Sequence, residues 1–392
     1  MFGPQDIDSY EPQGMEVMAR NGDYLRIFSP EVNSSVGAAV ALHMDDETTY
    51  FAVVTNRIGN REIEAWLPAC PDEVIQGTRV SFPAAQAGFV PPWEGHFQID
   101  STFFRPAQEG DLLAIPEAPA MSDLAGKLSP VTTGLKPLDL LSPVAAGGIT
   151  LLLEVAPTDS SDASTDLATD WLLHRCAEEL DPDLIVSLGE KPFLFADKPG
   201  WHLPAEHQDL FANLRALQVL AALGPALRRR KHTFVVVDLP AIPQFEHLQE
   251  KPAQVQAGLA EIVDLLGRQL ASTKEASITL LLRLVLHEDH QDLAAIIETL
   301  RLGDVDAQIF VDSQHRYIAS RSTSRAELSE AEILKRQEIL TTLTIADRAE
   351  EKAAIFGDDD LTVEEKEALA SRAQLLEASL LGTHQEGSFN SD

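Results

Sequence analysis

The hydrophobic pattern of the first hundred residues consists of short runs. Between about Met15 and Ile99, apolar or alternating stretches of five to nine residues are separated by Gly, Asn, Asp and Pro. Runs of this length and spacing are typical of β-strands joined by turns, and several in succession predict a small β-barrel or sandwich over residues 15–99. The runs are YLRIF (24–28), VGAAVALHM (36–44), TYFAVVT (49–55), EIEAWL (62–67) and TRVSFP (78–83). The polar residues 1–14 are expected to be a flexible lead-in.

The pattern changes beyond residue 130, where strand-like and helix-like runs alternate. Strands are predicted at 149–155, 184–188, 232–239, 277–286, 307–312 and 317–320. Helices are predicted at 164–180, 210–227, 254–269 and 291–300. Such alternation indicates an α/β core with a mostly parallel sheet covered by helices. Together with the Pro- and Ala-rich stretch before it, we expect this core to occupy residues 100–325.

The last part of the chain has a helical pattern. Residues 325–349 are rich in Leu, Glu, Ala and Ile. Thr362 is then followed three residues later by Glu365, the spacing of a capping box that begins a helix reaching about residue 381. We therefore expect a C-terminal helical domain at 326–382 and a flexible tail at 383–392.

Charge and composition narrow the classes of partner. The formal net charge is -32, which disfavours nucleic acid and anionic lipid as partners. The chain has two cysteines, with no spacing typical of a metal site, which fits a reducing compartment. Its apolar stretches are too short to span a bilayer and its start does not resemble a signal peptide. We expect a cytoplasmic protein without direct membrane insertion, at most peripheral to a membrane complex.

One segment of the core carries a specific resemblance. Residues 132–148 read TTGLKPLDLLSPVAAGG. This stretch resembles a segment of the α and β subunits of the F-type ATP synthase, just before the strand of the phosphate-binding loop. The matching positions are Thr133, Gly134, Lys136, Asp139, Leu140, Pro143 and Gly147. The resemblance implies a RecA-like core between an N-terminal barrel and a C-terminal helical domain.

Three further segments resemble the same family. DVDAQIFVD (304–312) is similar to a strand segment, and STSR (322–325) to the segment with an arginine that reaches a neighbouring subunit's nucleotide. FGDDDLTVEEKEALASR (356–372) is similar to the acidic loop and helix facing the rotating shaft of the β subunit. The resemblance thus implies partner contacts by Asp358, Asp359, Asp360, Glu364 and Glu365. An ordinary solvated helix start is the alternative for these acids.

The expected phosphate-binding loop is degenerate. Phosphate binding requires glycines that turn backbone N–H groups inward, a lysine and a Ser or Thr hydroxyl for magnesium. The strand 149–155 is instead followed by APTDSSDASTD, which has no glycine or lysine. We therefore expect no cofactor at Pro157, Thr158, Asp159 and Ser160, where a capped helix start is the simpler interpretation.

Three residues retain the family's catalytic residue types. Glu190 follows Gly189 where the resemblance implies the carboxylate that polarises the attacking water, although it could be a loop residue after a strand. Asp238 ends the strand FVVVD where magnesium would be coordinated. Arg325 matches the arginine that acts in trans on a neighbour's phosphate, with a solvated helix-start arginine as the alternative.

Three functions remain open from the sequence. The first is a non-catalytic, pseudo-ATPase subunit of an F-type-like ring, alternating with a catalytic β-like subunit around a central stalk in a hetero-hexamer. The second is an ATPase with an unusual site for ATP and magnesium, using Glu190 and Asp238. The third is a scaffold or regulatory protein outside the rotary complex. The first function accounts for Arg325 and the acidic residues 358–365 together with the degenerate phosphate-binding loop.

Overall fold

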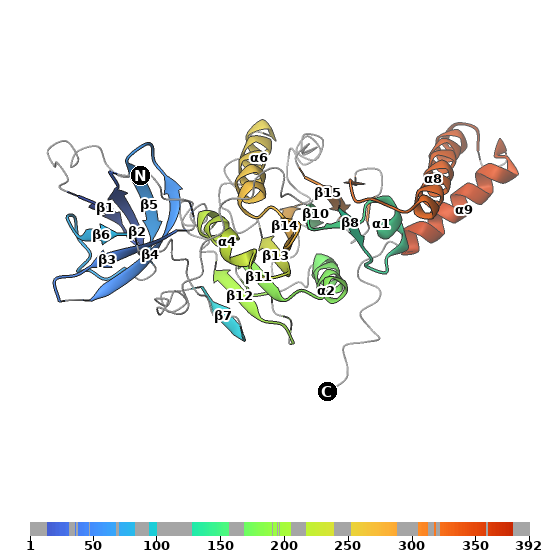
Figure 1. Cartoon of the computed structure of the whole chain (residues 1–392). Coiled ribbons are helices and arrows are strands. Elements are labelled where there is room, and N and C mark those ends of the chain that lie inside the picture. Colours follow the sequence, from blue (N-terminus) through green and yellow to red (C-terminus); the bar gives the residue numbers. More distant parts are fainter. Residues whose placement is uncertain are drawn as a thin grey trace. The chain divides into compact units, whose positions relative to one another are not determined.

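The chain forms two compact units. The computed structural model describes residues 14–30, 36, 38–46, 48–67, 70–82, 94–99, 128–156, 168–189, 191–193, 195, 197–204, 217–238, 252–287, 305–312, 317–318, 322–357 and 360–378 (Figure 1). Unit 1 comprises Met1–Leu124, Pro182–His247 and Ala257–Ile278. Unit 2 comprises Ala125–Asp181, Leu248–Gln256 and Thr279–Asp392.

A closed antiparallel barrel forms the N-terminal part of unit 1. Its strands are hydrogen-bonded in the order β1-β2-β5-β4-β3-β6. They are β1 (Glu16–Asn21), β2 (Tyr24–Phe28), β3 (Ala39–His43), β4 (Thr49–Arg57), β5 (Glu62–Trp66) and β6 (Arg79–Ser81). The predicted barrel is confirmed, and every strand except β1 corresponds to one of the predicted runs.

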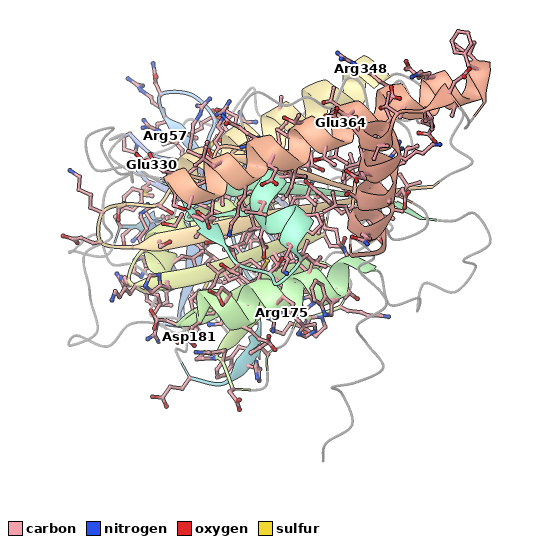
Figure 2. The ribbon with its side chains drawn as sticks, turned by 90° about the vertical axis from the view of Figure 1, so that its right-hand side faces the viewer. Arg57, Arg175, Asp181, Glu330, Arg348 and Glu364 are labelled. Atoms are coloured by element: carbon pink, nitrogen blue, oxygen red, sulfur yellow. The ribbon has the colours of Figure 1, made fainter. Side chains whose placement is uncertain are left out.

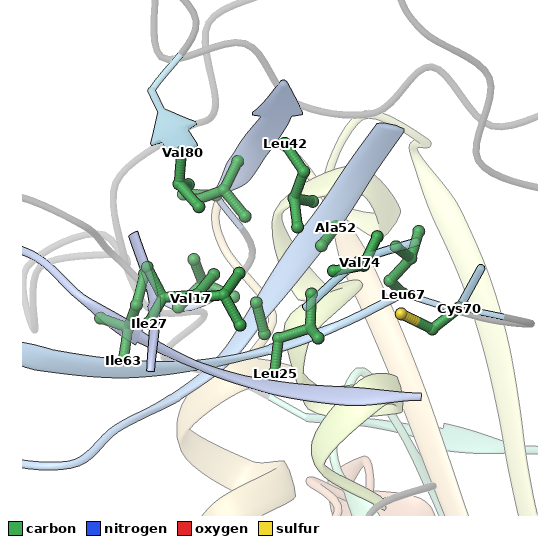
Figure 3. Close-up of a cluster of buried hydrophobic side chains, with 14 residues drawn as sticks. Val17, Leu25, Ile27, Leu42, Ala52, Ile63, Leu67, Cys70, Val74 and Val80 are labelled. Atoms are coloured by element: carbon green, nitrogen blue, oxygen red, sulfur yellow. The ribbon is translucent and has the colours of Figure 1, made fainter. Parts of the chain in front are cut away.

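The barrel core follows from alternation along these strands. In β2, Leu25 and Ile27 point inward and are fully buried, whereas Arg26 between them forms an ion pair with Glu62 of β5. Figure 3 shows the aliphatic side chains that meet inside the barrel. The buried members are Val17, Leu25, Ile27, Ala38, Val40, Leu42, Ala52, Val54, Ile63, Ala65, Leu67, Cys70, Val74 and Val80.

An eight-stranded mixed sheet has the order β16-β15-β10-β14-β13-β11-β12-β7. The strand pairs β10–β14, β10–β15, β11–β12, β11–β13 and β12–β7 are parallel, and the pair β15–β16 is antiparallel. Its strands are β7 (His96–Gln98), β10 (Ile149–Ala156), β11 (Leu184–Gly189), β12 (Gly200–Pro204), β13 (His232–Asp238), β14 (Ser277–His287), β15 (Ala307–Val311) and β16 (Thr323–Ser324). The strand β7 pairs with β12 in this sheet, although its residues fall within the range expected for the barrel.

Four described helices lie between the barrel and residue 270 of the chain. They are α1 (Lys136–Leu141), α2 (Ala168–Leu180), α4 (Gly224–Leu227) and α6 (Pro252–Gln269). A short antiparallel pair, β8 (Ser129–Val131) and β9 (Val144–Ala146), lies on either side of α1. The helix predicted at 210–227 is helical at 217–222 and again in α4. The interruption coincides with Pro225, which cannot donate the backbone bond that a continuous helix requires. The helix predicted at 291–300 lies outside the described residues.

Two antiparallel helices, α8 (Glu330–Phe356) and α9 (Val363–Ala378), end the described part of unit 2 (Figure 1). The predicted start of this helical region at Arg325 is wrong. Ser329 is the N-cap, and its reciprocal hydrogen bonds with Glu332 form a capping box that begins the helix at Glu330. Lys352 pairs with Glu365 across the two helices, and Arg372 pairs with Asp347. Within the described residues, no helix is both long and apolar enough to cross a membrane.

A core substitution tests the barrel. Leu25→Ala removes a fully buried side chain and should lower the free energy of unfolding of the barrel by about 2–5 kcal/mol. Hydrogen exchange of barrel peptides measures this loss. The matched control is Ile75→Ala, because Ile75 is 63% exposed and its truncation should change stability by no more than about 0.5 kcal/mol. Equal protection in the two variants would contradict the assigned core.

Candidate functional site

The segment with the family resemblance folds into a loop held by one carboxylate. Asp139 Oδ1 accepts hydrogen bonds from Thr133 N at 2.8 Å and Thr133 Oγ1 at 2.7 Å. Its Oδ2 accepts from Gly134 N at 2.9 Å. Gly134 has φ +88°, a conformation that favours glycine. The Thr, Gly and Asp of this motif are therefore explained by the geometry of the loop (residues 133–139) alone.

The helix α2 supports the same loop. Arg175 Nε donates to Thr133 O at 3.2 Å, and Figure 2 labels Arg175 on α2. The next turn of the chain is held to β14, because Gly147 N donates to Thr279 Oγ1 at 2.9 Å. These bonds fix the direction in which the chain enters β10.

Three segments that are distant in sequence meet beside the start of β10. Asp306 Oδ2 accepts from Ile149 N at 2.8 Å, and a side chain on Gly148 would lie 2.6 Å from the same oxygen. Ser324 Oγ donates to Pro143 O at 2.7 Å, and Arg325 N donates to Asp306 O at 2.7 Å. The segments 132–148, 304–312 and 322–325, selected separately from the sequence, thus form one hydrogen-bonded cluster in unit 2.

Arg325 lies at the edge of this cluster. It follows β16, and its backbone is fixed by Asp306. Its side chain is exposed, in the segment between β16 and the N-cap of α8. The structure thus positions Arg325 on a fixed backbone at the surface of unit 2.

The strand β10 and its neighbour β14 contain charged residues that the sequence analysis missed. Glu154 is the one charged residue of β10 and is completely buried. On the adjacent strand β14, Arg283 Nη1 donates to Asp170 Oδ1 in the first turn of α2 at 2.5 Å. The signal for Glu154 was present in ITLLLEVA, where one acid interrupts a run of apolar residues. The partner of Arg283 is 113 positions away in sequence and could not be identified from spacing.

The loop predicted to be degenerate lies outside the described residues. This applies to Pro157, Thr158, Asp159 and Ser160. Glu190, the candidate for polarising water, also lies outside them.

Asp238 ends β13 in unit 1. It lies against Gly189 of β11, where an added Cβ would be 3.0 Å from the Cβ of Asp238. A glycine at position 189 thus leaves space for this aspartate at the carboxyl end of the two strands. Among the described residues, no group of three or more His, Cys, Asp or Glu side chains is arranged to hold a metal ion.

A buried serine–histidine pair lies on the neighbouring strands of unit 1. His202 Nδ1 of β12 is 3.1 Å from Ser187 Oγ of β11, which accepts from Phe193 N at 3.2 Å. The serine hydroxyl can donate its hydrogen to an unprotonated Nδ1, an arrangement that suits a neutral imidazole. Burial lowers the pKa of His202 below its ordinary value.

The turn between α8 and α9 presents apolar side chains to solvent. Ile355 is 73% exposed, Phe356 66% and Val363 74%. We call these three residues, with Asp360 and Glu364, the hairpin tip. Asp360 and Glu364 are exposed, and Figure 2 labels Glu364, which lies in the first turn of α9.

The other acids predicted for partner contact differ in their surroundings. Asp358 and Asp359 lie outside the described residues. Glu365 Oε2 accepts from Thr362 N at 2.7 Å, and Glu365 N donates to Thr362 Oγ1 at 3.2 Å, which confirms the predicted capping box. Glu365 also accepts from Lys352 Nζ at 2.9 Å. These bonds, chiefly that from the Thr362 backbone, lower the pKa of Glu365. The Glu365 carboxylate therefore forms hydrogen bonds to groups of the helical hairpin itself.

A substitution in the Asp139 loop tests its structural role. Asp139→Asn keeps the shape of the side chain but removes the charge and one acceptor, so stability should fall by about 1.5–3 kcal/mol. Denaturant titration of the purified chain measures the loss. The control Lys136→Gln alters an exposed residue of the same loop and should stay within about 0.5 kcal/mol of the parent. If both variants behave alike, the carboxylate does not hold the loop.

The buried histidine predicts a pH dependence. Because the folded-state pKa of His202 is lowered, the unfolded chain binds the proton at higher pH than the folded chain. The contribution of His202 to stability should be complete above a pH of about 6.5 and should decrease as the pH falls below it. The measurement is the melting temperature from pH about 7.5 to about 5.5 for the parent and His202→Gln. Parallel pH curves for the two proteins would exclude this effect.

No model of a known protein family matches the chain, and no curated protein shows a significant sequence match.

Proposed function

We propose that this chain is a non-catalytic subunit in the ring-shaped head of an F-type-like rotary ATPase. In this proposal the sheet is a RecA-like core, and α8 and α9 belong to a C-terminal helical domain. The chain would alternate with a catalytic β-like subunit in a hetero-hexamer around a central stalk. The barrel would hold neighbouring subunits together, as the resemblance of residues 132–148 implies.

The observation that carries the proposal is the hairpin tip. Ile355, Phe356 and Val363 expose most of their surface at the same turn. Large apolar side chains gathered on a surface mark sites of protein association, because contact with a partner removes them from water. The acids Asp360 and Glu364 beside them favour a partner that combines apolar and basic residues. This chemistry supports a central-stalk subunit as the partner of the tip.

The sequence that follows β10 supports a non-catalytic role. It offers neither the lysine nor the glycines that hold a triphosphate, and it contains three aspartates that would repel one. We therefore propose that the chain holds no ATP or magnesium of its own. Arg325 would then act on the nucleotide of a neighbouring catalytic subunit. Its fixed backbone and exposed side chain are compatible with that role.

Capture of the tagged chain from its source cells tests the proposal. The parent should retain two proteins in fixed proportion, a homologue with an intact phosphate-binding loop and an elongated helical stalk protein. A variant with Ile355→Ser, Phe356→Ser and Val363→Ser should lose the stalk protein about tenfold or more, because these side chains would form the centre of that contact. It should retain the homologue, which binds through other surfaces.

The control for this experiment is Ile75→Ser. Ile75 is 63% exposed but belongs to the barrel part of unit 1, so this variant should retain both proteins. Quantitative mass spectrometry of the captured material gives the ratios. Capture of the same proteins in the same amounts by the tip variant would contradict the proposed contact. A parent chain that retains no homologue with a phosphate-binding loop would contradict the ring.

A further inference from the structure

The first half of α8 exposes large apolar side chains on one face. Leu334 is 67% exposed, Leu340 43% and Ile333 42%. On a helix, residues three, four and seven positions apart lie on the same face. Ile333 and Leu340 are seven positions apart, and Leu334 lies next to Ile333 along the chain. These side chains therefore form one apolar surface, separate from the hairpin tip at the other end of the helix.

The other exposed residues of this face carry no charge. They are Gln337, Thr341 and Thr344. Thr341 Oγ1 donates to Gln337 O at 2.8 Å, and Thr344 Oγ1 donates to Leu340 O at 2.8 Å. Because both hydroxyl hydrogens are bonded within the helix, covering these threonines leaves no donor without an acceptor. We call this face the α8 stripe, which consists of Ile333, Leu334, Gln337, Leu340, Thr341 and Thr344.

An acid and a base lie at the two ends of the α8 stripe. Glu330 precedes the stripe and Arg348 follows it, and both are exposed (Figure 2). They are eighteen positions apart, or about five helical turns, so they lie on the same face at a separation of about 27 Å along the axis. Among the residues that the structure describes, neither forms an ion pair, whereas Lys352 and Arg372 of the same hairpin do.

We propose that two copies of this chain associate through the α8 stripe, with their α8 helices antiparallel. An uncharged surface with an acid at one end and a base at the other is complementary to itself when one helix is reversed. Glu330 of each copy then lies opposite Arg348 of the other, as two-fold symmetry requires, and the stripe between the two pairs is removed from water. A parallel arrangement would place like charges together, which disfavours it. This inference does not rest on the proposed function.

Charge reversal tests the antiparallel pairing. Glu330→Arg places like charges opposite each other at both ends of the stripe, and so does Arg348→Glu, so each variant alone should raise the dissociation constant of the dimer about tenfold. An equimolar mixture of the two variants again has opposite charges at both ends and should associate as the parent does. Sedimentation velocity measures these constants between about 1 and about 100 µM protein. An ionic strength of about 0.15 M screens the repulsion between two acidic chains.

A second variant tests the apolar part of the α8 stripe. Leu334→Ser with Leu340→Ser removes two exposed leucines and should raise the dissociation constant by about tenfold or more, because less apolar surface is buried on association. The matched control is Ile75→Ser, which changes a side chain that is 63% exposed in the barrel part of unit 1. This control should associate as the parent does.

Three results would each overturn the proposal. The first is a parent chain that stays monomeric over the whole concentration range. The second is a dimer that the Leu334 and Leu340 double variant leaves intact. The third is a mixture of the two charge variants that associates no better than either variant alone. Because these measurements use the purified chain and leave the hairpin tip unchanged, their failure leaves the captured ring proteins as a separate test of the proposed function.

Discussion

The interior position of β10 in the sheet constrains the residues around it. The strand is hydrogen-bonded in parallel to β14 on one side and to β15 on the other. Leu151, Leu152 and Leu153 are completely buried, as expected for a strand covered on both faces. A charge in such a strand must be balanced by residues that pack against it. Glu154 is the one acidic residue of this strand, and Arg283 lies one pair away on the same face of the sheet.

Carboxylates with two different roles surround β10. At its start, Asp306 binds the backbone of Ile149, and Asp139 holds the loop that precedes the strand. These carboxylates accept hydrogen bonds from backbone N–H groups and therefore determine where the chain runs. Further along, Asp170 in the first turn of α2 is paired with Arg283 of β14, which is opposite Leu152 in the middle of β10. This ion pair joins α2 to the sheet.

The sequence predicted most of the strands and fewer of the contacts. Alternation such as that of Leu25, Arg26 and Ile27 is a local signal, so the barrel could be recognised without knowledge of its closure. The strands β1, β7, β8, β9 and β12 were not predicted; those of three residues, such as His96–Gln98, have too few residues to show a pattern. The start of α8 was misplaced because helix-forming residues begin before Ser329, and the capping box with Glu332 decides the boundary.

In the candidate site, only hydrogen bonds between residues of the same short segment could be predicted from the sequence. Thr133 and Asp139 are six positions apart, and Thr362 and Glu365 are three, so both pairs could be anticipated from a motif. The pair of Asp170 and Arg283 depends on which strands become neighbours in the sheet. That order is set by the packing of the whole core and is not encoded in any local spacing.

The proposed function requires that this chain does not bind nucleotide. Isothermal titration calorimetry of the purified chain with ATP and magnesium tests this requirement most directly. No heat of binding is expected up to millimolar nucleotide, because the sequence that follows β10 has three aspartates and neither the glycines nor the lysine that hold phosphates. Saturable micromolar binding would contradict it and would direct mutation to Glu190 and Asp238.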